Sequence, residues 1–166
     1  NIEVTLYEID PLILDALSAT MQECQRRCAG SGIRLTFTIH PVDFIQEMVE
    51  SLASELFSEQ TPQFDAAIVN PPYRKIGKDS PERRLLQNIG VETGNLYSGF
   101  IALIHRFLAP GGQLIGITPR SFCNGPYFRL FREDFLRHLE LRQVHVFESR
   151  QAAFRNDNVL QENIIF

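Results

Sequence analysis

The feature that most constrains the fold is a repeated switch between strand-like and helix-like periodicity. A β-branched apolar run at 2–9 predicts a strand, and the helical spacing of apolar residues after Asp10 predicts a helix that ends near Gly30. Further strands are predicted at 33–39, 66–69, 113–118, 141–147 and 159–166, and further helices at 45–56, 96–108 and 128–139. Strands that alternate with helices predict an α/β fold with a mostly parallel sheet covered on both faces. No helix separates the last two strands, so we expect them to form an antiparallel edge pair.

Length and composition are those of one ordinary folded domain. The chain has 166 residues, of which 44% are hydrophobic and 22% charged, which is enough apolar material for a real core. No apolar run approaches the roughly 20 residues that a membrane helix needs, so we expect no membrane partner. The net charge of −4 argues against a compact, wholly basic nucleic-acid binder. Contacts with nucleic acid would have to come from a local patch or from another domain.

The cysteines and histidines show no spacing typical of a disulfide framework or a zinc site. Cys24 and Cys28 lie four residues apart on a predicted helix, and Cys123 stands alone. Free thiols in a reducing cytoplasm are therefore the better interpretation. The four histidines supply no paired spacing, so we expect no metal site.

The sharpest motif is Asn70-Pro71-Pro72-Tyr73, directly after the predicted strand at 66–69. Two consecutive prolines fix the backbone and remove two amide donors, which leaves a stiff loop whose carbonyl oxygens are available as acceptors. Asn70 adds an amide oxygen and Tyr73 adds a flat ring. This set suits a planar group that bears an amine: two acceptors for the amine and one aromatic face for stacking. The alternative is a proline-rich turn with a buried tyrosine.

Two acidic residues follow the first two predicted strands. Glu8 lies where a carboxylate can accept hydrogen bonds from ribose hydroxyl groups, as acidic residues do in nucleotide-binding α/β folds. Asp43 could accept from an adenine amino group while Phe44 packs on the ring. Asp10 is better explained as a helix N-cap, and an N-cap is equally open for Asp43.

These motifs in this order resemble the amino-methylating DNA methyltransferases. The resemblance rests on residues 6–11, 42–44 and 70–73. The continuation narrows it to the gamma-class adenine-N6 DNA methyltransferases of bacterial restriction–modification systems, through residues 95–100, 108–112, Phe154 and 158–166. The likeness covers nearly the whole chain. It implies a Rossmann-like methyltransferase fold with three αβα layers, S-adenosylmethionine as cofactor and double-stranded DNA as substrate, in a bacterial cytoplasm.

By this resemblance, Glu8 would bind the cofactor ribose, and Asp43 with Phe44 would hold its adenine. Asn70 and the Pro71 carbonyl would accept hydrogen bonds from the target amine, within the loop that Pro72 stiffens. Tyr73 would stack on the target base, and Phe154 would pack as a second aromatic, a role that Phe147 could fill instead.

The chemistry of the amine gives these acceptors a purpose. The lone pair of adenine N6 is delocalised into the ring, so acceptors that favour a tetrahedral nitrogen would localise it toward the methyl donor. The base must leave the duplex to reach such a pocket, which costs a few kcal/mol that aromatic stacking partly offsets.

The sequence also departs from the family pattern. In this family a strand and a glycine-bearing motif, which holds the methionine part of the cofactor, precede the strand that carries Glu8, and a target-recognition domain usually follows; we expect residues 1–166 to lack all three. We therefore expect residues 1–166 to be a partial catalytic domain that is inactive alone. A specificity domain or subunit and a restriction endonuclease are expected partners, and exposed strand edges could let two copies associate.

Other interpretations stay open. The motif at 70–73 also occurs in enzymes that methylate ribosomal RNA or a protein glutamine, and a non-catalytic binding domain could keep the same residues. A dehydrogenase fits poorly, because the chain shows no glycine-rich dinucleotide turn. The predicted long polar loop at 74–95 carries five cations, which either touch DNA phosphates or are plain surface charges: Arg74, Lys75, Lys78, Arg83 and Arg84.

Overall fold

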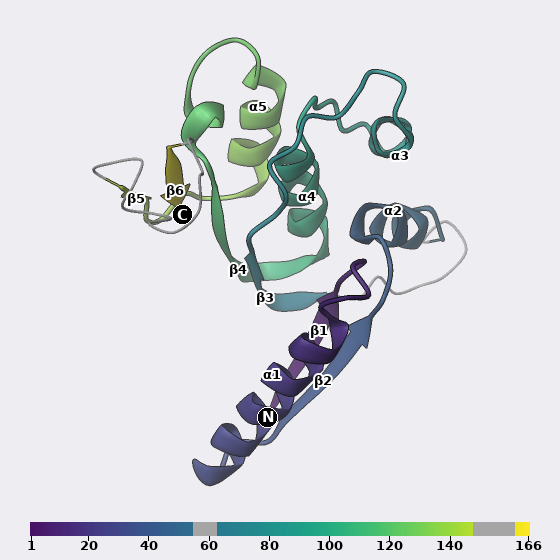
Figure 1. The fold of residues 1–166 in the computed structure, drawn as a ribbon. Coiled ribbons are helices and arrows are strands. Elements are labelled where there is room, and N and C mark those ends of the chain that lie inside the picture. Colours follow the sequence, from purple (N-terminus) through teal and green to yellow (C-terminus); the bar gives the residue numbers. More distant parts are fainter. Residues whose placement is uncertain (55–62, 148–161) are drawn as a thin grey trace. The chain divides into compact units, whose positions relative to one another are not determined.

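The paired strands fall into two separate sheets. The computed structural model describes residues 1–54, 63–147 and 162–166, which divide into two compact units, Asn1–Glu47 and Met48–Phe166 (Figure 1). The first unit contains a two-stranded sheet, β1-β2, and the second a four-stranded sheet in the order β3-β4-β6-β5. β1 pairs with β2 and β3 with β4 in parallel, which confirms the predicted α/β class.

The first unit is a strand–helix–strand element. β1 (Ile2–Tyr7) leads through α1 (Leu14–Gly30) to β2 (Leu35–His40), and the two strands end together because Tyr7 is in register with His40. Gln25 ties the helix to the sheet through a hydrogen bond from its Nε2 to the Leu35 carbonyl oxygen at 3.0 Å. The carboxyl ends of both strands therefore lie at one edge, where ligands sit in open α/β sheets.

The boundary between the units falls within α2 (Phe44–Ser54). Its predicted apolar face is confirmed at Ile45, Met48 and Val49, which are at most 5% exposed. Leu56, which we also predicted on that face, lies outside the described residues.

The second unit holds the larger sheet. β3 (Phe64–Val69) pairs in parallel with β4 (Leu108–Pro119), and β6 (Asn163–Ile165) runs antiparallel to both β4 and β5 (His145–Val146). The predicted antiparallel edge pair is therefore confirmed.

Two expectations about the strand β4 and its neighbours were wrong in detail. The strand predicted at 113–118 is longer, because β4 begins at Leu108 and passes through Pro110-Gly111-Gly112 with a register shift opposite Phe64 and Ala66. Gly112 allows this close passage, since a Cβ there would lie 2.9 Å from the Ala109 carbonyl oxygen. The strand predicted at 141–147 is limited to His145 and Val146.

The predicted polar loop at 74–95 contains a helix, α3 (Pro81–Asn88). Ser80 caps it by accepting a hydrogen bond from the Arg83 amide at 3.3 Å, and Pro81 occupies the first turn, where a missing amide proton costs nothing. The helix is polar and buries Leu86 completely. A helix with a single fully buried residue has no apolar stripe, so the periodicity did not reveal it.

The remaining helices of the second unit surround an aromatic core. They are α4 (Leu96–Ile104), the 3-10 helices η1 (His105–Phe107) and η2 (Arg120–Cys123), and α5 (Arg129–His138). The core consists of Tyr97, Ile101, Phe122, Phe128, Phe131, Phe135 and Ile164, with Val69, Tyr73, Leu114, Leu139 and Phe166 packed against it. The core thus reaches from the helices to the end of β3, where the predicted motif begins. No helix among the described residues has the length and apolar character needed to cross a membrane.

Candidate active site

The Asn-Pro-Pro-Tyr motif lies where we predicted it, at the carboxyl end of β3. Asn70 and Pro72 are exposed, Pro71 is buried and Tyr73 is half-buried against the aromatic core. The Tyr73 hydroxyl group lies 3.0 Å from Asn70 Oδ1 and 3.2 Å from the carbonyl oxygen of Ile117 on β4. Burial raises the pKa of Tyr73, so this group stays a protonated donor at neutral pH. The amide oxygen that we predicted to accept the target amine is therefore at the surface and already holds one hydrogen bond.

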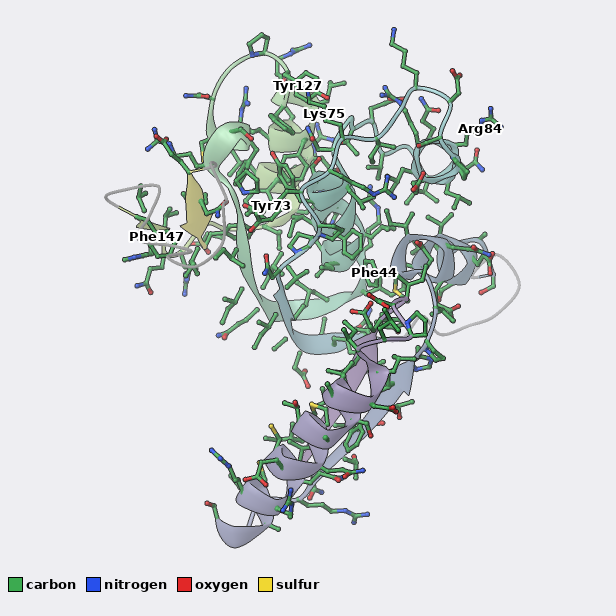
Figure 2. All side chains as sticks on the ribbon, viewed as in Figure 1. Phe44, Tyr73, Lys75, Arg84, Tyr127 and Phe147 are labelled. Carbon is green, nitrogen blue, oxygen red and sulfur yellow. The ribbon has the colours of Figure 1, made fainter. Side chains whose placement is uncertain are left out.

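A pocket of about 270 Å³ lies beside Tyr73 within the second unit. Its lining residues are Tyr73, Lys75, Asn95, Tyr97, Pro119, Ser121, Tyr127 and Phe128. Tyr97 meets Tyr73 edge to face with ring centroids 6.3 Å apart, and its hydroxyl group lies 3.2 Å from Ser121 Oγ. Figure 2 labels three of these lining residues, Tyr73, Lys75 and Tyr127.

Most of this lining was not predicted from the sequence. Tyr73 was predicted as a base contact and Lys75 as a loop cation, but no role was predicted for Tyr97, Ser121 or Tyr127. Tyr97 falls inside the 95–100 run that carried the family resemblance, so that run was the available signal. The others come from segments distant in sequence, and no local pattern connects them.

Gly94 makes room for one wall of the pocket. A Cβ at this position would lie 2.1 Å from the Tyr127 hydroxyl oxygen, which is far inside van der Waals contact. Tyr127 therefore rests on the backbone of Gly94, although the ring remains 64% exposed. The width of the pocket depends on this absence of a side chain.

The predicted cofactor residues gather at one edge of the first unit. Glu8 follows β1, and its Oε1 accepts a hydrogen bond from the Asp10 amide at 2.7 Å. Asp43 follows β2, and its Oδ1 accepts from the Gln46 amide at 2.9 Å, which is an N-cap of α2. The N-cap interpretation of Asp43 is thus correct, and its second oxygen is not used by the cap.

Aromatic rings accompany these two carboxylates. Tyr7 stacks on His40 with centroids 5.1 Å apart and meets Phe44 edge to face at 5.4 Å. Two carboxylates with a second oxygen each, beside a set of flat rings, fit the ribose and adenine of a nucleotide-like cofactor. Binding by Glu8, Asp43 and Phe44 stays a prediction.

Asp10 does not cap α1 as we predicted. Its Oδ1 accepts a hydrogen bond from the Leu12 amide at 2.9 Å and so stabilises the turn that precedes the helix. The helix begins at Leu14, and its N-cap residue Ile13 makes no side-chain cap. Pro11 lies inside this turn, ahead of the first helical residue.

The second aromatic of the predicted base site is not placed. Phe154 lies outside the described residues. Phe147, the alternative, is half-buried and meets His145 edge to face at 4.8 Å. It does not belong to the pocket lining.

The five cations of the 74–95 segment differ in their partners. Arg74 forms an ion pair with Glu82 and holds the pKa of that carboxyl below its usual range, and Arg83 pairs with Glu92 at 3.4 Å. Lys75, Lys78 and Arg84 have no acidic partner among residues 1–54, 63–147 and 162–166. Arg74 and Arg83 therefore stabilise the fold through ion pairs, whereas the other three cations stay available to an anion.

A histidine cluster joins η1 to α5. His105 Nε2 lies 3.1 Å from Asp134 Oδ2, and His138 Nδ1 lies 3.4 Å from Asp134 Oδ1, so three groups that can bind metals come within 4.8 Å of one another. Arg106 Nη1 lies 2.9 Å from His105 Nε2 and 3.7 Å from Asp134 Oδ2. Because this guanidinium group already neutralises the carboxylate, we interpret the cluster as an ion-pair network. Burial lowers the pKa of His105, and Asp134 opposes that effect.

Comparisons with known proteins identify the family of this chain. Residues 32–154 match the family described as Eco57I restriction-modification methylase. All 166 residues are 46% identical to the Type II methyltransferase M.PstI of Providencia stuartii, and 98% of the chain is 42% identical to the Type II methyltransferase M.BsuBI of Bacillus subtilis. The chain spans 32% of the length of each of these relatives.

A solved structure shows the fold. A protein from Listeria monocytogenes, assigned to the class I S-adenosylmethionine-dependent methyltransferases, matches with a TM-score of 0.55 at 13% identity. The match covers 99% of this chain and 53% of that one, which confirms the predicted Rossmann-like methyltransferase fold. The family match covers well over half of the chain, and both relatives are well above 30% identical. The chain therefore belongs to the Eco57I restriction-modification methylase family.

Proposed function

We propose that this chain is the catalytic core of a DNA methyltransferase that transfers a methyl group from S-adenosylmethionine to the N6 amine of adenine. The observation that carries the proposal is the Asn70–Tyr73 loop, which ends a parallel strand and places an exposed amide oxygen beside an aromatic ring. Membership in a restriction-modification methylase family supports DNA as the substrate. The acceptor pair and the flat ring suit an aromatic amine.

The chain's residues would act by binding and orientation. Asn70 Oδ1 and the Pro71 carbonyl oxygen accept the two amine protons and favour a tetrahedral nitrogen, which frees its lone pair for attack. Bound S-adenosylmethionine supplies an electrophilic methyl group on its sulfonium. Tyr73 covers the base and offsets part of the cost of unstacking it from the duplex. The proton that the amine loses passes to solvent, since the loop offers acceptors but no dedicated base.

The cofactor proposal rests on the edge of the first unit. S-adenosylmethionine is supported by the methylase family and by the methyltransferase fold. Glu8 would accept hydrogen bonds from the ribose through Oε2, because Oε1 holds the Asp10 amide. Asp43 and Phe44 would receive the adenine. A direct check is equilibrium binding of the cofactor to wild type and Glu8→Gln.

The partners follow from the same proposal. Double-stranded DNA is the substrate, and a specificity segment or subunit and a restriction endonuclease are the expected associates in a bacterial cytoplasm. Because the chain matches only 32% of each relative, we propose that residues 1–166 are part of a catalytic domain and do not methylate DNA alone. Self-association through strand edges also stays a prediction.

The deciding experiment uses the full-length polypeptide that contains this chain. It is incubated with labelled S-adenosylmethionine and unmethylated bacterial DNA, and the modified nucleosides are identified by mass spectrometry. N6-methyladenine is expected from wild type and from Asn88→Ala, an exposed asparagine at the end of α3, but not from Asn70→Ala. A different methylated base, or label found only in RNA or in a protein glutamine, would overturn the adenine proposal.

A further inference from the structure

The pocket beside Tyr73 is separate from the amine acceptors. Of the four residues in the loop 70–73, only Tyr73 contributes to its lining. Asn70 and Pro71, which we propose to hold the amine, do not. The space thus borders Tyr73 without reaching the amine acceptors, and a part of the substrate other than the amine would occupy it.

The lining has the chemistry of a nucleotide site. Among the described residues, the lining has four rings, those of Tyr73, Tyr97, Tyr127 and Phe128, and no acidic side chain. Lys75 is the one charged side chain within this described lining. Aromatic rings combined with a cation are typical of sites that hold a nucleic-acid strand, because rings stack on bases and cations pair with phosphates.

Lys75 is held at this pocket by its backbone. It forms an antiparallel bridge with the buried Asn95. Hydrogen bonds on either side strengthen the bridge, from the Ile76 amide to the Gly94 carbonyl oxygen at 2.8 Å and from the Leu96 amide to the Arg74 carbonyl oxygen at 2.9 Å. A cation with a fixed backbone loses less conformational entropy when it pairs with an anion than one on a free loop.

Lys75 is also electrostatically available. Its neighbour Arg74 is paired with Glu82, and Arg83 is paired with Glu92. Lys75 has no such partner in the described part of the chain, and it lines the pocket together with Tyr127, whereas Figure 2 shows Arg84 apart, on α3.

We infer that this pocket is a subsite for the target-strand nucleotide next to the methylated base, with Lys75 paired to its phosphate and the rings packed against its sugar and base. The inference rests on the proposed function and extends it. A volume of about 270 Å³ is below the roughly 300–1,000 Å³ of sites for drug-sized ligands, so it suits a single nucleotide unit. The contact holds the strand beside Tyr73 and so helps to orient the target amine.

The test removes the positive charge of Lys75 from the protein and the negative charge of one phosphate from the DNA. Binding is measured for the full-length protein on the shortest duplex that wild type methylates, with natural linkages or with a neutral methylphosphonate at one phosphate beside the target adenine. Lys75→Met is compared with Lys78→Met, which removes the same charge from the same segment outside the pocket lining.

The expected result is a pairwise coupling. Neutralising that phosphate should weaken binding about 2- to 5-fold for wild type and Lys78→Met, and should have no further effect on Lys75→Met. The slope of log K against log salt should be less steep by about 0.9 for Lys75→Met on natural DNA. Equal phosphate sensitivity in both variants, at every phosphate flanking the adenine, would overturn the inference. That result leaves the proposed function intact, because the latter fails only if wild type forms no N6-methyladenine.

Discussion

The hydroxyl group of Tyr73 is expected to limit access to Asn70 rather than to take part in methyl transfer. Its single proton is shared between Asn70 Oδ1 at 3.0 Å and the Ile117 carbonyl oxygen at 3.2 Å. A net hydrogen bond inside a protein contributes about 0.5–1.5 kcal/mol. Tyr73→Phe should therefore lower the free energy of unfolding by about 1 kcal/mol and, because it frees Asn70 Oδ1, strengthen binding of the unpaired amine by up to about fivefold.

The ring of Tyr73 should matter more than its hydroxyl group. Tyr73→Ala removes the surface on which the base would stack, together with the edge contact to Tyr97. Stacking of one base on an aromatic side chain contributes about 1–3 kcal/mol. Base binding should therefore weaken by between about fivefold and 150-fold in Tyr73→Ala.

Two measurements separate these effects. Fluorescence of 2-aminopurine at the target position reports the unstacked base, and denaturant unfolding reports stability. Both are made on the full-length protein, with Asn88→Ala as the matched surface control. Loss of more than tenfold in methylation rate by Tyr73→Phe, with base binding unchanged, would refute the reasoning, because the hydroxyl group would then act in the reaction itself.

Three further changes test the packing around the site. Gly94→Ala should force the exposed Tyr127 ring to rotate, which alters DNA affinity in a binding titration but shifts the melting temperature little; a large loss of stability would contradict this. Burial lowers the pKa of His105 below 6.5, so the unfolded chain takes up a proton at this ring more readily than the folded protein does. The stability that the neutral ring contributes is therefore present above that pH and lost as the pH falls below it. His105→Gln should flatten the pH dependence of the free energy of unfolding between about pH 5 and 7. Leu86→Ala should lower the free energy of unfolding by about 2–5 kcal/mol in denaturant titration, and a loss under 1 kcal/mol would show that α3 is not held by this side chain.

The elements that sequence predicted well are those with local causes. The Asn70–Tyr73 loop was located because an apolar strand precedes it and two prolines stop that strand. The carboxyl-edge positions of Glu8 and Asp43 followed from the alternation of strands and helices, since parallel strands end on the same side. Both inferences needed only the neighbouring residues and the alternation of strands with helices.

The parts that sequence did not predict depend on long-range packing. The pocket joins Tyr73 to Ser121 and Tyr127, which are distant in sequence and come together only through packing around the aromatic core. The pairing of His105 with Asp134 has the same cause, because 29 residues separate them. For Asp43, both roles use the same carboxylate in the same place, so only the structure could show that it caps α2.

The bridge between Lys75 and Asn95 closes the segment that carries α3 at its base. The chain runs away from the site after Tyr73 and comes back beside Lys75 at Asn95. The segment between these two residues is therefore a loop whose two ends are held together. Doubling the length of such a loop raises the entropic free-energy cost of closing it by only about 0.6 kcal/mol. Changes in length between the fixed ends of the stretch 77–93 should therefore cost little closure entropy, provided that Leu86 keeps its buried position.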